Sequence, residues 1–321
     1  MKAYRSAAVL TAAALVLCCA SCGDKKNKDS SKSAENNKKI TSSAAEESSK
    51  SSNDETATDG EDNAEPALTA VDGQFIMQAY DMFQSSQYSL RLTYTDPDGI
   101  ETDIYRVVDG DDYYEVQTGD IGTNGCISVN GEAYDFDSVC GIFRKRTQGK
   151  PETLIETVVE QRLPATDTNI DPNEAAVYEA EEYTYTGGTY ITVMDFYFDK
   201  QTGLPVKYTT RYMVEEENGD EGMTETRLVK DIMYGAGGEL TASDGETHEL
   251  DRTVFDTAFI KDLVDFDSMT AEQKLGYCKA IFVTANVTAD ELAEAGFGDD
   301  KLRNISYEDF TSLVYTYGYD A

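Results

Sequence analysis

The stretch DFYFDKQTGLPVKYT, residues 195–209, places two runs of aromatic and β-branched residues on either side of a short polar segment. Such residues favour extended backbone, whereas Gly and Pro interrupt it. Asp199 and Gly203 are turn residues, and Pro205 stands at the entry to the second run, where a missing N–H is tolerated. The pattern therefore predicts two antiparallel strands joined by a tight turn.

The alternation continues on both sides of this hairpin. The strands of the hairpin itself are predicted over residues 189–199 and 204–214, and further strands over 175–186, 223–234 and 249–256. The strand at 189–199 is largely apolar on both faces, which is typical of a strand covered on both sides. The strand at 204–214 alternates apolar residues with Lys207, Thr209 and Arg211, so one of its faces is expected to meet water.

The first half of the domain is predicted to begin with a helix and continue as a β-meander. Apolar residues recur at helical spacing from Phe75 to Phe83, and then alternate from Tyr88 onward. Strands are predicted at 88–95, 104–108 and 111–118, with a turn at 96–99. A hairpin is predicted over 126–137, because Asn130-Gly131 suits the positive φ angles of a type I′ turn.

A second helix is predicted over residues 150–163, between the two sets of strands. Pro151 suits the first helical turn, and the loop that follows extends from Pro164 to residue 173. One face of this helix is apolar, formed by Leu154, Ile155, Val158, Val159 and Leu163.

Helical signals return at the end of the chain. Thr270 with Gln273, Thr288 with Glu291 and Ser306 with Asp309 have the spacing of a capping box. We expect residues 268–321 to form a small helical appendage beside the sheet. The fold class is therefore α+β, with a mainly antiparallel sheet domain over residues 67–267.

The amino terminus has the layout of a secretory signal. Lys2 and Arg5 precede an apolar run that is too short to span a bilayer comfortably. Small residues flank Cys22, and this stretch resembles a bacterial lipobox, although Cys19 stands where Leu is usual. The resemblance implies a signal peptide over 1–22, a diacylglyceryl (palmitate-type) anchor on Cys22, and attachment to the extracytoplasmic face of the cell membrane. The alternative is an ordinary cleaved signal with incidental cysteines.

Residues 23–66 are predicted to be a disordered polar linker. Ile40 is the only large aliphatic residue there, so the segment cannot offset its ordering entropy by burial. A flexible chain of this length reaches about 35 Å. Lysines near its start can contact an anionic leaflet, or can simply keep the spacer solvated.

Composition excludes several function classes. The net charge is -34, so nucleic-acid binding, which depends on Lys and Arg, is not expected. His248 is the only histidine and has no partner at ligand or triad spacing, and no Gly-rich phosphate loop is present. We therefore expect no enzymatic activity, no metal site and no cofactor. Cys126 and Cys140 could pair, although the predicted hairpin places Cys126 opposite Asp135.

The chain resembles the lipoprotein-carrier superfamily, to which LolA, LppX and RseB belong. The shared features are a lipidated cysteine, a spacer, an opening helix, antiparallel strands and a central helix. The D-x-x-T-G-L-P turn at Asp199 to Pro205 is the most specific shared element. The resemblance implies a strongly curved, half-barrel-like sheet with helices on its concave face, enclosing a cavity for acyl chains.

Within such a cavity, the resemblance implies an apolar lining from the central helix and from the strand opposite it. The candidate lining residues are Leu154, Ile155, Val158, Val159, Tyr190, Met194, Phe196 and Phe198. The alternative is a filled core, which bulky Phe and Tyr favour. The sequence thus leaves two functions open: an anchored extracytoplasmic protein that binds a lipid or other apolar ligand, or a surface module that binds another envelope protein.

Overall fold

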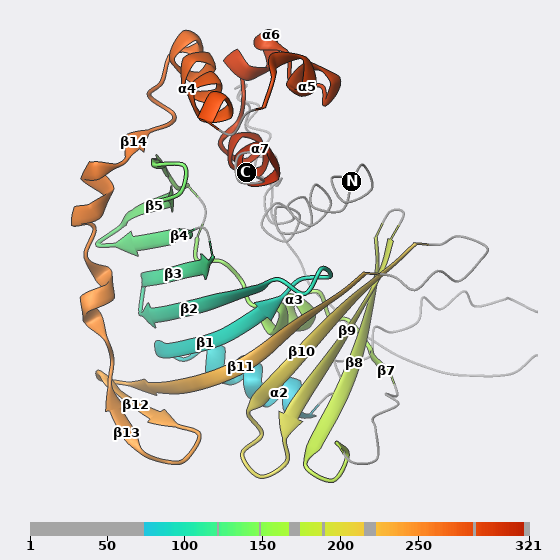
Figure 1. Cartoon of the computed structure of the whole chain (residues 1–321). Helices are drawn as coiled ribbons and strands as arrows, with labels where there is room; N and C mark the ends of the chain where they lie inside the picture. Colours follow the sequence, from blue (N-terminus) through green and yellow to red (C-terminus); the bar gives the residue numbers. More distant parts are fainter. Residues whose placement is uncertain are drawn as a thin grey trace, which may run out of the picture.

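The computed structural model describes residues 74–120, 122–147, 149–166, 174–187, 190–214, 223–284 and 287–317. The predicted signal peptide, Cys22 and the predicted linker lie outside the described residues. The described chain is an α+β fold with a strongly curved, unclosed and mainly antiparallel sheet (Figure 1).

Fourteen strands of the described chain form one sheet. In chain order the strands are β1 (Gln87–Thr95), β2 (Glu101–Asp109), β3 (Asp112–Gly119), β4 (Gly122–Val129), β5 (Glu132–Asp137), β6 (Ile142–Lys145), β7 (Ala165–Thr166), β8 (Tyr178–Gly187), β9 (Tyr190–Asp199), β10 (Pro205–Val214), β11 (Met223–Ala236), β12 (Glu239–Ala242), β13 (Thr247–Glu249) and β14 (Val264–Asp265).

Two meanders meet at the centre of this sheet. The spatial order is β14-β6-β5-β4-β3-β2-β1-β11-β10-β9-β8-β7, and β12 and β13 extend from one end of β11. All described pairings are antiparallel except that of β14 with β6. The join between the meanders is the β1–β11 pair, in which Tyr88 lies opposite Tyr234.

Helices cover the sheet in three places. The helical elements are α2 (Gln74–Phe83), α3 (Leu154–Glu160), η1 (Arg252–Phe255), η2 (Ala258–Asp262), α4 (Ala271–Thr284), α5 (Ala289–Glu294), α6 (Asp299–Arg303) and α7 (Tyr307–Tyr317). The helices α2 and α3 lie on the concave face, and the short 3₁₀ helices run along the opposite face of the first meander (Figure 1). The four C-terminal helices lie at the β6 end of the sheet.

The main core lies between the concave face and the helices α2 and α3. From α2, Ile76, Ala79 and Phe83 are buried at the i, i+3, i+7 positions of one helix face, as the periodicity predicts. Phe83 and Tyr88 meet edge to face with ring centroids 5.2 Å apart. Each fully buried large apolar side chain contributes about 1.5–3 kcal/mol of transfer free energy, so this contact fixes α2 on the sheet.

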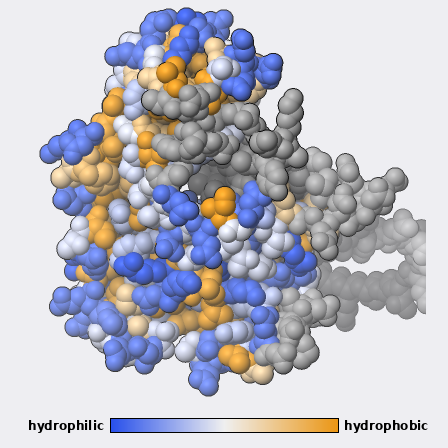
Figure 2. Space-filling model, in the orientation of Figure 1, coloured by the Kyte–Doolittle hydropathy of each residue, from blue (hydrophilic) through white to orange (hydrophobic). Residues whose placement is uncertain are grey.

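A second core joins the C-terminal helices to the sheet. Cys140 and Ile142 from the sheet side pack with Phe266, Phe310 and other residues of the helical unit. On the face of the described chain that Figure 2 shows, charged and polar residues predominate and are interrupted by apolar patches.

Most of the predicted elements are confirmed. Asn130 and Gly131 have φ angles of 53° and 81°, so the I′-type hairpin forms, and Cys126 does pair with Asp135. Thr288 with Glu291 makes a complete capping box. The box of Thr270 with Gln273 is complete as well, whereas Ser306 makes only the half that accepts from the Asp309 N–H.

Three predictions about single elements are wrong. The expected strand at 249–256 is only the end of β13 followed by η1, because the side chain of Asp251 accepts the N–H of Thr253 and starts a helical turn. Pro151 precedes the helix, whose N-cap is Thr153. The expected loop after Pro164 contains the two-residue strand β7.

Candidate functional site

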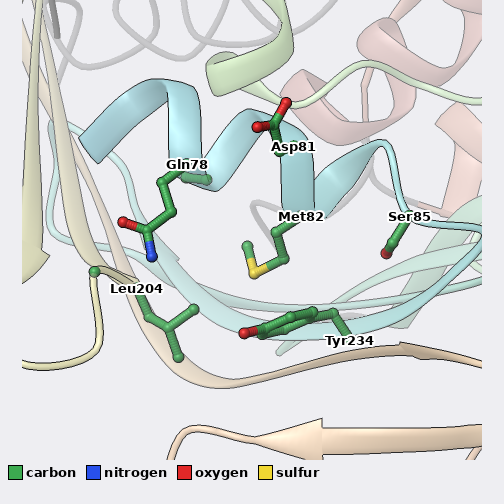
Figure 3. A pocket seen from close by; sticks show the side chains of 8 residues that line it. Gln78, Asp81, Met82, Ser85, Leu204 and Tyr234 are labelled. Atoms are coloured by element: carbon green, nitrogen blue, oxygen red, sulfur yellow. The ribbon is translucent and has the colours of Figure 1, made fainter. Parts of the chain in front are cut away.

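A groove of about 350 Å³ lies between α2, the turn that joins β9 to β10, and β11 (Figure 3). It is lined by Gln78, Ala79, Asp81, Met82, Ser85, Gly203, Leu204 and Tyr234. The groove is open to solvent on one side and borders the main core on the other.

The helical spacing of α2 explains which side chains enter the groove. Because Ile76, Ala79 and Phe83 face the core, Gln78, Met82 and Ser85 fall on the neighbouring flank. Figure 3 shows Gln78 and Met82 pointing toward Leu204 and Tyr234. The same figure shows the carboxylate of Asp81 turned away from them.

The position of α2 is fixed from a distant strand. The carboxylate of Glu181 on β8 accepts the backbone N–H groups of Phe75 and Ile76, each at 3.0 Å. The hydroxyl of Tyr183 donates to the same carboxylate at 2.9 Å. The first N–H groups of a helix have no partners within it, so Glu181 acts as the missing N-terminal cap of α2.

The wall opposite α2 is the D-x-x-T-G-L-P turn that the sequence singles out. Asp199 accepts the N–H groups of Gln201 and Thr202, and these hydrogen bonds, the one from Thr202 foremost, lower the pKa of Asp199. Gly203 has a φ of +71°, and a Cβ there would lie 2.6 Å from the Oε1 of Gln78. The positive φ favours glycine at this turn, and a larger residue would also have to push the flexible end of Gln78 aside.

The groove has an apolar floor and a polar rim. Ala79, Met82, Leu204 and the ring of Tyr234 form the apolar part. Apart from Gly203, the remaining lining residues are polar or acidic, and none of them is Lys or Arg. An apolar surface with a few oriented polar groups is the usual make-up of a small-molecule site.

The residues that the family resemblance assigned to a cavity lie elsewhere. Ile155, Val158, Met194, Phe196 and Phe198 are brought together, but as buried members of the main core. Leu154 and Val159 pack against this core from its edge, and the side chain of Tyr190 lies outside the described residues.

The interior around these residues is packed with rings. The ring of Phe196 has its centroid 5.4 Å from that of Tyr208 and 5.8 Å from that of Tyr183. None of the seven described candidates lines the groove.

A network of ion pairs occupies the concave face beyond the main core. Arg106 forms an ion pair with Glu115. Asp135 forms ion pairs with Arg144 at 2.8 Å and with Arg146 at 2.6 Å. Burial raises the pKa of the neighbouring Cys126 thiol. These charges satisfy one another, so the network reinforces the sheet.

A buried carboxylate links the sheet to the C-terminal helices. Asp137 is 1% exposed and accepts the N–H of Cys140 at 2.7 Å. Burial raises the pKa of Asp137, against the opposing effect of hydrogen bonds from Cys140 and from the hydroxyl of Tyr315 on α7. Asn124 of β4 also donates to that hydroxyl, at 3.0 Å.

Cys126, Cys140 and Cys278 are all buried free thiols, so no bridge joins Cys126 to Cys140. His248 lies on the exposed strand β13. Among the described residues no three His, Cys, Asp or Glu side chains are arranged to hold a metal ion. None of the helices in those residues has the length and apolar composition needed to cross a bilayer.

No model of a known protein family matches the chain, and no curated protein is significantly similar to it. Several solved structures are distantly similar to the chain, and two of them are described next. An uncharacterized conserved protein from Thermus thermophilus is 11% identical, with a TM-score of 0.32 over 50% of this chain and 86% of that one. A LolA superfamily protein from Nitrosomonas europaea is 10% identical, with a TM-score of 0.22 over 50% of this chain and 92% of that one.

Proposed function

We propose that this protein is a lipid-anchored, non-catalytic binding protein that holds an apolar chain in the groove beside α2. The observation that carries this proposal is the groove itself, with an apolar floor formed by Ala79, Met82 and Leu204 and a volume of about 350 Å³. Pockets that bind small ligands fall in the range of about 300–1,000 Å³.

The proposed ligand site lies beside α2 and not between α3 and β9, where the family resemblance implies a cavity. Ile155 and Val158 on α3 and Phe196 on β9 are at most 1% exposed, so a ligand between them would have to displace packed side chains. In the groove no such displacement is needed. The residues of the main core then act as the support that holds α2 at the edge of the ligand.

The proposed membrane anchor is a thioether-linked lipid on Cys22. This lipid would hold the domain at the extracytoplasmic face of the membrane. Two or more acyl chains give stable attachment, whereas one alone gives reversible binding. Cells labelled with radioactive palmitate test this point: the label should enter the wild-type chain and be absent from Cys22→Ala. Label in the variant, or none in the wild type, would remove the anchor from the proposal.

Ligand binding is tested by filling the groove from a residue that does not hold the fold. Gln78 is exposed and lines the groove, so Gln78→Trp should abolish binding of a decyl-chain amphiphile in calorimetry. Gln74→Trp is the matched control, since Gln74 is an exposed residue of the same helix outside the groove. Equal binding by both variants would contradict the proposed site.

The filled main core and one surface feature support a second candidate, a module that binds another envelope protein. Val283 on α4 is 73% exposed, and α4 belongs to a helical unit fixed to the sheet. Crosslinking in cells should then trap one defined partner through this unit. A crosslink that survives Val283→Glu unchanged would count against this version.

A further inference from the structure

The groove beside α2 has a definite length. It extends along the helix from Gln78 to Ser85, which lie toward opposite sides of Figure 3. Met82 lies between them, and its side chain points toward the ring of Tyr234. Seven residue steps of an α-helix correspond to about 10 Å along the axis. A ligand chain that lies along α2 therefore has about 10 Å of groove to occupy.

One end of the groove is closed by a tight contact. The backbone of Gly203, in the turn between β9 and β10, lies against the amide of Gln78, and a Cβ on this glycine would be 2.6 Å from Oε1 and 2.8 Å from Nε2. The turn is held in place because Asp199 accepts two of its backbone N–H groups. A chain that enters from the side of Ser85 therefore ends at Gln78.

The length and the volume of the groove agree on the size of that chain. Three backbone bonds of an extended polypeptide advance about 3.5 Å, so a saturated carbon chain of similar geometry advances about 1.2 Å per bond. A groove of about 10 Å then holds about nine carbons. The volume of about 350 Å³ holds about twelve groups of the size of a water molecule, which is close to that of a methylene. Both values indicate a chain of about ten carbons.

The chains of ordinary membrane lipids are longer than this groove. The hydrocarbon core of a bilayer is about 30 Å thick, so the chains of one leaflet reach about 15 Å. With one end of the groove closed at Gln78, about a third of such a chain would stay in water. Burial of apolar surface is what would hold the chain, so this third adds nothing to affinity.

Resting on the proposed function, we infer that the groove binds single-chain amphiphiles of about ten carbons, and that Gln78 sets this limit by closing the groove against Gly203. The end of the chain lies at Gln78 and the polar end at Ser85. Shorter chains bind more weakly because they bury less surface. Longer chains, including those of membrane lipids, gain nothing from their extra carbons.

A series of alkyl maltosides with six, eight, ten, twelve and fourteen carbons tests the inference, each used below its critical micelle concentration. The protein is the full chain carrying Cys22→Ala, and the measurement is calorimetry. The dissociation constant should fall about fourfold for each added methylene up to ten carbons and then stop falling. Gln78→Ala removes the side-chain amide that closes the groove, so the fall should continue to twelve carbons or more. Gln78 is exposed and alanine favours helix, so this variant should fold.

The matched control is Gln74→Ala, the same substitution at an exposed residue of α2 outside the groove. This control should keep the limit at ten carbons. An affinity that rises steadily to fourteen carbons in the wild type, or a limit that Gln78→Ala leaves in place, would overturn the inference and leave the groove as a binding site. A limit that both variants move equally would overturn it too. Absence of binding by every probe would instead overturn the proposed function.

Discussion

At the scale of single residues, Glu181 supports the candidate site without lining it. Its carboxylate accepts two backbone N–H groups of α2 and one tyrosine hydroxyl, and Glu181 lies 105 residues after Ile76 in the chain. A carboxylate at a helix N-terminus also interacts favourably with the helix dipole. The groove wall is therefore held by a contact that no local pattern in α2 reveals.

Replacing this cap tests its contribution. Glu181→Ala should lower the free energy of unfolding by about 2 kcal/mol, because it leaves helix N–H groups without partners and removes a charged acceptor. The matched control is Glu179→Ala, since Glu179 lies on the same strand and its one side-chain interaction within the described part of the chain is an exposed ion pair with Lys200. Chemical denaturation should show a change of about 0.5 kcal/mol or less in the control. Similar losses in both variants would contradict the capping role.

The buried Asp137 should make stability depend on pH. Because the folded chain raises the pKa of this carboxyl, the native state binds its proton more tightly than the unfolded state does. Its contribution to stability is then largest in acid, and it is lost as the pH rises from about 3.9, the unfolded value, through the raised folded value.

Asp137→Asn removes this contribution and keeps an oxygen for the N–H of Cys140. The difference in stability between wild type and variant should shift in favour of the variant from pH 4 to pH 7, as followed by denaturant titration. Subtracting the two curves removes the repulsion among the other acids. Parallel curves would show that Asp137 does not titrate differently in the folded chain.

At the scale of elements, two glycines are expected to respond to alanine with opposite signs. Gly125 lies on β4, where a Cβ would collide with the carbonyl oxygen of Glu115 and lie 2.9 Å from the Cα of Val116. Gly276 lies on α4 with open space around it and an ordinary helical backbone. The two positions differ in environment but receive the same methyl group.

Gly125→Ala should destabilise the fold by about 1–3 kcal/mol, since the β3–β4 pair must shift to admit the methyl group. Gly276→Ala should stabilise it by about 0.5–1 kcal/mol, because alanine loses less backbone freedom in a helix interior. Thermal unfolding of both variants measures the two effects. A change of the same sign in both would mean that space around the added carbon does not decide the outcome.

Local patterns predicted the elements that local forces determine. The helix at Gln74–Phe83 and the hairpin at Asn130-Gly131 follow from spacing and turn chemistry alone, and both are present. Local patterns do not predict β6, β12 and β14, which have two to four residues each and depend on neighbouring strands for their pairing. Alternation at 249–256 was misleading because one Asx-type hydrogen bond outweighs it there.

The groove could not be predicted from the sequence for a related reason. Met82, Leu204 and Tyr234 come from three separate regions of the chain and meet only after the β1–β11 pair has formed. The turn at Asp199 to Pro205 was the one visible signal, since it was singled out as a turn and now forms a wall. The candidates on α3 and β9 were apolar for the ordinary reason that they form the core.

At the scale of the whole molecule, the C-terminal helices complete the sheet domain. Ile142 on β6 and Phe266 are 0% exposed only because the helical unit covers them. Tyr277 adds a hydrogen bond to the carbonyl of Cys140 at 2.6 Å. Each large apolar side chain that loses this cover loses about 1.5–3 kcal/mol of transfer free energy.

A chain that ends at Asp267 should therefore melt at a lower temperature and self-associate in sedimentation experiments. The intact chain with Val283→Ser serves as the control, since that side chain is already 73% exposed and should matter little to stability. If the shortened chain remains monomeric with an unchanged melting temperature, the helical unit and the sheet are independent of each other.

The meeting of two meanders at β1 also has a consequence for biogenesis. Strand β1 pairs on one side with β2, which follows it in the chain, and on the other side with β11. Tyr88 therefore has no cross-strand partner on that second side until Tyr234 has been synthesised. A nascent chain must keep the bare edge of β1, with Leu90 and Leu92 beside it, out of contact with other chains until nearly the whole sheet has been synthesised. Long-range pairing of this kind closes slowly, so this half-built sheet is the species that we expect to be most prone to aggregation.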